Sequence, residues 1–281
     1  MKPIRSTTEY ESILKEAKAN IGGGLMSNEY SLDTGSIERY ASASRLYWEE
    51  INSGILILVN MDWYYSMLFI VDPSLPPDSP SVTDKPVQFG LMAIKGRNDL
   101  FFDTMRGYWK AAGFELNSTR LRLAVTYNEE SLKAIENAHE VIHEVKIARP
   151  DQFEEGLALL LSVFNPVTNI FPNKDDMKRS MEDGNFLVIE NKEGRIICIT
   201  ECEFGKTSFK LWRIATDTNY RGQRFHWHCR RYATRKAFDM GIRRNIAWVE
   251  DWNAKSIHNI TSMGMKFDGR LSEQYILKGG I

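Results

Sequence analysis

The sequence predicts an α/β fold with a mixed central sheet flanked by helices, built as two domains in tandem. A chain of 281 residues is long enough for two domains of ordinary size. Hydrophobic residues at 43% and charged residues at 26% fit a globular protein with a proper core. In each half, a run of strands is combined with helical segments, and this mixed order favours a layered α/β domain over a bundle or a sandwich.

The charge balance excludes some function classes. Lys plus Arg number 36 and Asp plus Glu number 37, so the chain lacks the basic footprint of a general nucleic-acid binder. The first 20 residues are charged and amphipathic, which argues against a signal peptide or membrane span and predicts a cytoplasmic location. Three cysteines without a CxxC spacing predict neither a disulfide framework nor a zinc site; they are Cys198, Cys202 and Cys229.

The first half, residues 1–130, begins with helical patterns at 9–21 and 36–51. Two strands at 54–61 and 63–71 follow with almost no linker, which predicts antiparallel neighbours. After a Pro/Ser-rich loop, a strand at 87–94 and a helix at 98–113 complete the pattern. A domain boundary is expected near residues 126–140.

The second half, residues 140–281, opens with a strand and a helix starting at Pro150 or Asp151. A short helix and three strands follow, the last ending near Thr216. A helix to Met240, a strand at 245–249, a helix stopped by Gly264 and two extended runs complete it. The expected order is therefore β-α-α-β-β-β-loop-α-β-α-β.

The loop "TDTNYRGQRFH", Thr216 to His226, has the properties of an anion site. A strand that ends in a tight turn and opens a helix aims unpaired backbone N–H groups at one point, where the helix dipole favours negative charge. Arg224 could add a charge-assisted contact to a phosphate. His226 and His228, two residues apart on a helix, point to different faces, so no metal site is predicted.

With this order and two local motifs, residues 140–281 resemble the Gcn5-related N-acetyltransferase (GNAT) family. The family's pyrophosphate loop is matched by Tyr220, Arg221 and Gly222, while Arg224 and His226 stand at its two later glycine positions. An Asn followed eleven residues later by Gly and an apolar residue is matched by Asn253 and Gly264–Met265. Ile260 stands where the family commonly has a Tyr. The first half resembles a degenerate copy without the Arg-Gly loop.

The resemblance implies an N-acetyltransferase that uses acetyl-CoA, or another acyl-CoA, as cosubstrate and needs no metal. A small-molecule amine would attack the thioester directly, and a homodimer is compatible with this activity. The expected base is Glu250, with Glu201 or Glu203 on the preceding strands as a second candidate. The proton for the leaving thiolate would come from Ser256, His258 or a tyrosine of the first half, or the thiolate would leave without a dedicated acid. The implied CoA-binding residues are Ile214, Ala215, Thr216, Arg221, Gly222, Gln223, Arg224, Phe225, His226 and Asn253.

Two other functions stay open from the sequence. A non-catalytic CoA-binding or regulatory module would explain the altered loop and the missing Tyr. Nucleic-acid binding through the Arg-rich helix is disfavoured by the near-zero net charge. The charges of that helix are expected to form a solvated face; they are Arg230, Arg231, Arg235 and Lys236.

Overall fold

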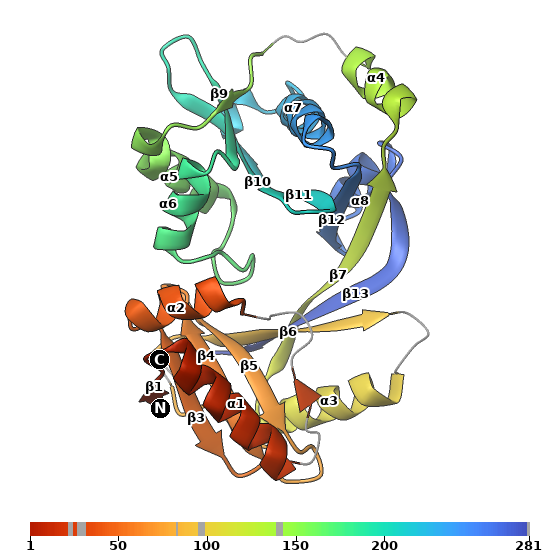
Figure 1. The fold of residues 1–281 in the computed structure, drawn as a ribbon. Helices are drawn as coiled ribbons and strands as arrows, with labels where there is room; N and C mark the ends of the chain where they lie inside the picture. Colours follow the sequence, from red (N-terminus) through yellow and green to blue (C-terminus); the bar gives the residue numbers. More distant parts are fainter. Residues whose placement is uncertain (22–24, 27–31, 83, 95–98, 139–142, 280–281) are drawn as a thin grey trace. The chain divides into compact units, whose positions relative to one another are not determined.

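The computed structural model describes residues 1–21, 25–26, 32–82, 84–94, 99–138 and 143–279 (Figure 1). The three glycines at 22–24, where the sequence favours a loop between the two expected helices, lie outside them. The chain forms two compact units: unit 1 comprises Met1–Arg120 and Gly269–Ile281, and unit 2 comprises Leu121–Asp268. The units are defined by contacts, whereas the expected domains 1–130 and 140–281 follow a family resemblance and stay a prediction. No helix in the described residues is long and apolar enough to cross a membrane.

Unit 1 contains a mostly antiparallel sheet. Its only parallel register among the described pairs joins β5 to β6. Residues 270–277, from the last strand of the chain, pair with β6. In spatial order the strands are β1 (Lys2–Pro3), β3 (Leu46–Ile51), β4 (Gly54–Asn60), β5 (Tyr65–Val71), β6 (Val87–Ile94) and β13 (Lys266–Leu277), with β2 (Leu25–Met26) beside β5.

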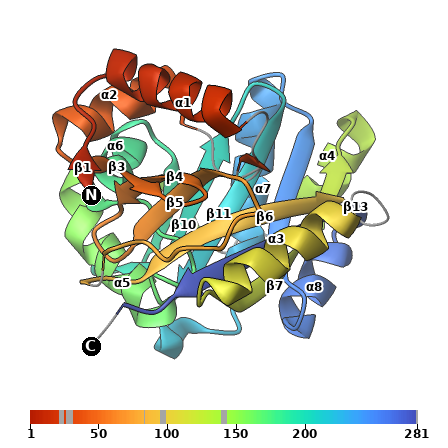
Figure 2. The ribbon, with the colours of Figure 1, turned by 90° about the horizontal axis from the view of Figure 1, so that it is seen from below.

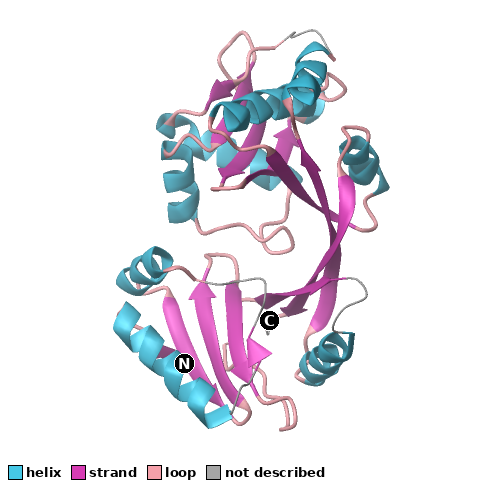
Figure 3. Cartoon of the chain, turned by 45° about the vertical axis from the view of Figure 1, so that its right-hand side comes forward, coloured by secondary structure: helices cyan, strands magenta, loops and turns pink. Residues whose placement is uncertain are grey.

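Helices cover both faces of the unit 1 sheet. On one face α3 (Asp99–Ala111) inserts the fully buried Trp109 between Phe69 and Phe89. Side chains alternate along a strand, so Leu56 of β4 packs in the α3 layer and its neighbours face the other side. On that side α1 (Thr7–Ile21) lies alongside the strands and contacts α2 (Thr34–Ser42) (Figure 3).

The helix expected at 36–51 is wrong in its second half. It ends at Ser42, Ser44 adopts a left-handed φ of 53°, and residues 46–51 form strand β3. Leu46 is fully buried in this strand and Tyr47 packs at its edge on Tyr65, so tertiary burial overrides the weak helical periodicity. The two extended runs expected at the C-terminus are likewise one strand, β13.

The described elements of unit 2 follow the expected order after a first strand and a first helix. They are β7 (Glu115–Thr126, which begins in unit 1), α4 (Glu129–Asn137), β8 (Lys146–Ile147), α5 (Phe153–Val163), α6 (Lys174–Glu182), β9 (Phe186–Glu190), β10 (Ile196–Phe204), β11 (Ser208–Thr216), α7 (Phe225–Asp239), β12 (Arg244–Glu250) and α8 (Ala254–Thr261). The sheet order is β7-β12-β11-β10-β9-β8. The β11–β12 pair is parallel, and α7 is its crossover.

The two faces of the unit 2 sheet carry different helices (Figures 1 and 2). Cys202 of β10 and Leu211 of β11 pack on Ala233 and Ala237 of α7. Ile199 of β10 faces α5, where a Cβ on Gly156 would lie 2.6 Å from its Cδ1. The sheet is therefore sealed by α7 on one side and α5 on the other.

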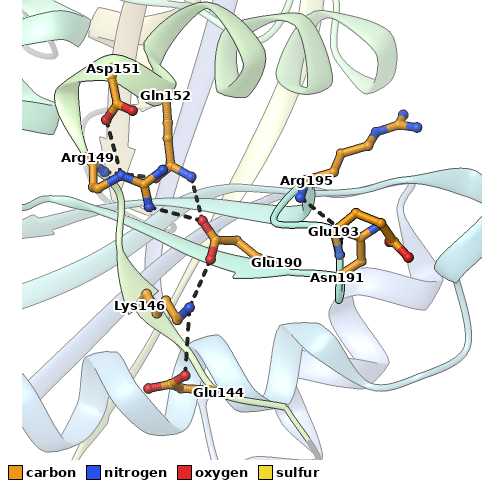
Figure 4. Close-up of polar contacts among 9 residues, drawn as sticks. All are labelled: Glu144, Lys146, Arg149, Asp151, Gln152, Glu190, Asn191, Glu193 and Arg195. Atoms are coloured by element: carbon orange, nitrogen blue, oxygen red, sulfur yellow. Dashed lines mark hydrogen bonds and ion pairs between the residues drawn. The ribbon is translucent and has the colours of Figure 1, made fainter.

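A polar network fixes the edge strand β8 of unit 2. Figure 4 shows the Glu190 carboxylate between Lys146, Arg149 and Gln152. The Lys146 Nζ and Gln152 Nε2 atoms donate to it at 2.9 and 2.7 Å. Hydrogen bonding from Lys146 lowers the pKa of Glu190. In the same view, Asn191 Oδ1 accepts from the backbone N–H of Arg195 at 2.9 Å and closes the β9–β10 turn.

The start of β4 provides a test of the unit 1 fold. Gly54 has a φ of 151°, and a Cβ there would lie 2.0 Å from the Ile70 carbonyl oxygen. We expect Gly54→Ala to lower the free energy of unfolding by about 3 kcal/mol, because backbone strain and a backbone clash act together. The matched control is Gly107→Ala in α3, where a Cβ meets nothing within 4 Å and stability should rise by about 0.5–1 kcal/mol. Equal effects in urea unfolding would contradict this account.

Candidate functional site

The parallel pair β11–β12 is joined over a short stretch. Its register covers Ser208–Lys210 against Arg244–Ile246, although β11 continues to Thr216 and β12 to Glu250. The unpaired part of β11 and β12, beyond Lys210 and Ile246, is called the gap. In β10 and β11 the register changes from Thr200↔Ile214 to Cys202↔Leu211, so β11 carries one extra residue. A bulge of this kind bends the strand and increases its twist.

The loop from β11 to α7 forms at the open end of the gap. After the 3-10 turn at Thr218–Tyr220, Arg221 is extended, Gly222 has a φ of 86°, and α7 begins at Phe225. Arg224 precedes the helix with φ 59° and ψ 28° and makes no side-chain capping hydrogen bond. The Trp227 and His228 N–H groups donate to the Arg224 carbonyl at 2.8 and 3.4 Å. The N–H groups of Phe225 and His226 are therefore the ones at this helix start that lack an intrahelical acceptor.

Arg224 keeps the backbone conformation that glycine usually provides. A left-handed φ is costly for residues with a Cβ, and it is the conformation for which a loop of this kind uses glycine. A Cβ at Gly222 would meet no atom within 4 Å. Glycine is therefore favoured here by its positive φ, and the space around it is open. Arg224 thus adopts the left-handed conformation despite its Cβ, and His226 lies in the first turn of α7.

Contacts from the β9–β10 turn hold the loop in place. Arg195 Nη2 donates to Asp217 Oδ2 at 3.0 Å, and the other carboxylate oxygen accepts from Asn219 N–H at 2.9 Å. Asn191 Nδ2 donates to the Tyr220 hydroxyl at 3.4 Å. Tyr220 also packs against the core cluster that contains Phe225 of α7. The loop is therefore anchored before any ligand binds.

Positive charge gathers at the start of α7. The pKa of His226 is lowered, first by burial and then by the neighbouring charges of Arg230, His228, Lys255 and Arg224. Lys255 lies in the first turn of α8, so the N-termini of α7 and α8 both contribute to this field. The cations around His226, namely Arg224, Arg230 and Lys255, give this helix start a positive field that favours an anion.

The structure gives the Asn253–Gly264 spacing a local explanation. Asn253 is the N-cap of α8, and its Oδ1 accepts from the Ser256 N–H at 3.0 Å. Gly264 has a φ of 83° just after the helix ends. The two residues therefore mark the beginning and the end of α8. Glu250 ends β12, at the same end of the parallel pair as the loop, and its carbonyl accepts from Asn253 N–H at 3.0 Å.

Glu201 is placed differently from Glu250. Its carboxylate forms a buried ion pair with Arg213 Nη1, and each side chain is 8% exposed. Arg213 Nη2 also donates to the Asn169 carbonyl at 2.9 Å and stacks 4.5 Å from the Phe171 ring centre. Glu201 also alternates with Cys202, which faces α7, so it lies on the α5 side of the sheet. This setting favours a structural role for Glu201.

The remaining candidates line the loop or the strand before it. Ile214 packs with Phe225 and Cys229, Ala215 is fully buried, and Thr216 Oγ1 donates to Cys198 Sγ at 3.6 Å. Gln223 and Arg221 are exposed. Among the charges of α7, Arg235 is exposed as expected, whereas Arg230 is 6% exposed. Nothing in the spacing of the sequence distinguishes Arg230 from its charged neighbours.

The ion pair provides a test of the role of Glu201. We expect Glu201→Gln to lower the free energy of unfolding by about 3 kcal/mol, because it leaves the Arg213 charge buried without a countercharge. The matched control is Glu203→Gln on the same strand, whose exposed carboxylate pairs with Lys210 at 2.8 Å and should change stability by about 0.5 kcal/mol or less. A Glu201→Gln variant as stable as the control would contradict this structural role.

Comparisons with known proteins support the fold. No protein-family model matches the sequence, and no curated protein matches it. Among solved structures, the chain is similar to a tandem GNAT protein from the clavulanic acid biosynthesis pathway, with a TM-score of 0.58, 10% identity, and coverage of 100% of this chain and 98% of that one. A Drosophila protein gives a TM-score of 0.57 at 10% identity, covering 99% of both chains.

A third similar structure is a Gcn5-related N-acetyltransferase from Sphaerobacter thermophilus. Its TM-score is 0.52 at 10% identity, and the match covers 97% of this chain and 93% of that one. At such low identity the likeness establishes the fold and no more. The fold class expected from the sequence is confirmed: the chain has the tandem fold of the Gcn5-related N-acetyltransferases.

Proposed function

We propose that unit 2 is an acyl-CoA-dependent N-acyltransferase, in the simplest case an acetyltransferase, acting on a primary amine of a small molecule. The observation that carries this proposal is the loop before α7. Gly222 and Arg224 both adopt the left-handed conformation and lead directly into the start of a helix. That helix start lies at the open end of the gap between β11 and β12.

The pyrophosphate of CoA would accept hydrogen bonds from the first N–H groups of α7. Arg224 would add a guanidinium contact, and Lys255 at the start of α8 would add a second positive charge. The arm carrying the thioester would extend into the gap, where strand backbone groups are not used by the β11–β12 register. The exposed loop and the anchored turn behind it suit a ligand that enters from solvent.

The chemistry requires one base. An amine is protonated near neutral pH, so it must lose a proton before its nitrogen attacks the thioester carbonyl. Glu250, at the end of β12, would take this proton directly or through a water molecule. The C–N bond forms, the C–S bond breaks, and CoA leaves as a thiolate. A thiol with a pKa of about 8.5 is a good leaving group, so the absence of a Tyr at Ile260 is compatible with turnover without a dedicated acid.

A non-catalytic CoA-binding module is the second candidate. Its support is specific: Ile260 replaces the usual Tyr, and the candidate base Glu201 is held in the ion pair with Arg213. Both candidates share the CoA site and differ in turnover, so they are separated by activity and not by binding.

CoA binding is tested by calorimetry with acetyl-CoA. We expect saturable binding, and no binding at millimolar ligand would overturn the proposed function. We expect Arg224→Gly to weaken binding by about 10-fold through loss of one charge-assisted contact. Its stability should be retained or increased, because glycine adopts the left-handed conformation without strain. Arg244→Ala, at the other end of β12, is the control; tighter binding by Arg224→Gly would identify Arg224 as an obstruction.

Turnover is tested with a panel of primary amines and a thiol assay for released CoA. We expect Glu250→Gln to lower kcat/KM by about 100-fold or more, because a positioned base contributes roughly that factor. Acetyl-CoA binding should be unchanged in this variant. Asp251→Asn, the next and more exposed carboxylate, is the matched control. Equal turnover by the wild type and Glu250→Gln would remove Glu250 from the mechanism.

A further inference from the structure

Arg230 is a buried charge without a countercharge. It lies in the middle of α7, is 6% exposed, and its pKa is lowered by burial. Its Nη1 lies 3.5 Å from the Met265 sulfur, and its Nε has no hydrogen-bond partner in the described residues. No Asp or Glu of the described chain forms an ion pair with it. Since arginine stays protonated, this charge is present in the folded protein.

The contrast with Arg213 shows what is missing. Arg213 is buried to a similar degree in the same unit, and it has a carboxylate and a backbone carbonyl as acceptors. Arg230 faces a thioether, which is a weak acceptor, and the hydroxyl of Tyr127. Buried charges in proteins are normally paired or hydrogen-bonded, so an acceptor supplied from outside the chain is expected at Arg230.

Two buried hydroxyls near Arg230 have donor capacity left. The Tyr127 hydroxyl lies against the Arg230 guanidinium and makes no other hydrogen bond in the described residues. The Thr234 hydroxyl, one helical turn after Arg230 on the same face of α7, is buried and makes no hydrogen bond in the described residues. Threonine in a helix often bonds the carbonyl four residues earlier, and Thr234 does not. A guanidinium and two hydroxyls are donors that suit a carboxylate.

The position of Arg230 relates this group to the gap. On one side its charge acts on Cys202, which packs against α7 and pairs with Leu211 of β11. On the other side it touches Met265, which packs against Ala247 and Val249 of β12. Arg230 therefore lies on the α7 face of the sheet. The residues around it pair with or pack against β11 and β12, the two strands that border the gap. His226, in the first turn of α7, is also close enough to sense its charge.

We propose that Arg230 binds a carboxylate at the far end of the acyl group, so that the donor is the CoA thioester of a dicarboxylic acid. This assignment rests on the proposed acyltransferase function and replaces acetyl by an acyl group with a terminal negative charge. The acyl chain extends from the thioester through the gap to the α7 face of the sheet. Tyr127 and Thr234 donate to the carboxylate oxygens that the guanidinium leaves free.

The test compares succinyl-CoA with butyryl-CoA, which has a methyl group in place of the carboxylate. Binding is measured by calorimetry for the wild type, Arg230→Met and Arg230→Lys. We expect the wild type to bind succinyl-CoA about 30-fold more tightly than butyryl-CoA, as for a buried charge pair. Arg230→Met should lose this preference, and Arg230→Lys should keep part of it. The matched control is Arg235→Met on the same helix, an exposed arginine paired with Asp239, which should keep the full preference.

The outcomes separate the two proposals. If no CoA thioester binds, the proposed function itself fails. If CoA thioesters bind without preference for succinyl-CoA, or if Arg230→Met keeps the preference, the assignment of Arg230 is overturned while CoA binding stands. Free succinate is included as a probe; if it stabilises the wild type through Arg230 without any thioester preference, the carboxylate site does not belong to the donor.

A stability measurement tests whether Arg230 has a purely structural role. Without ligand, Arg230→Met should unfold at the same or a higher temperature than the wild type, because no internal countercharge is lost. A large fall in melting temperature for both Arg230→Met and Arg230→Lys would show that the chain itself satisfies this guanidinium, and would overturn the proposal.

Discussion

The short parallel register between β11 and β12 is the constraint on which the candidate site depends. A parallel pair needs a crossover, and here the crossover is α7, so the helix must start where β11 ends. Because the register stops at Lys210 and Ile246, the strands have unpaired backbone at that same end. The position of the helix start, where we propose that an anion binds, and the open strand ends are thus both related to this one pairing.

Local patterns in the sequence were sufficient for much of the fold. The order of elements in unit 2 follows from hydrophobic periodicity and from glycines that end an element or form a turn. These glycines all have positive φ; they are Gly184, Gly194, Gly241 and Gly264. Periodicity failed at 46–51, where a strand follows directly after a helix and no glycine or proline marks the change. The candidate site was predicted by the same means, since a strand, a polar turn and a helix are local features.

What the sequence could not provide are the long-range partners. Glu201 is twelve residues from Arg213 in the sequence, and their pairing follows from the β10–β11 register, in which both residues lie between the pairs Thr200↔Ile214 and Cys202↔Leu211. Arg230 lies among four similar charges on α7, and only the packing of Met265, 35 residues later, shows that it is buried. The conformation of Arg224 is equally hidden, because an arginine gives no sign of a left-handed backbone. The Asn253–Gly264 spacing reflects the length of α8, since Asn253 caps the start of this helix and Gly264 follows its end. It therefore says less about function than about local structure.

The last strand has a consequence for how the chain can fold. Residues 270–277 of β13 pair with β6, about 180 residues earlier, and belong to unit 1. During synthesis, unit 1 therefore cannot complete its sheet when its first 120 residues have emerged. One edge of strand β6 stays unpaired until all of unit 2 has been synthesised, and unpaired edges favour pairing with other chains. The two units cannot be separated by a single cut, and their order of completion reverses their order in the sequence.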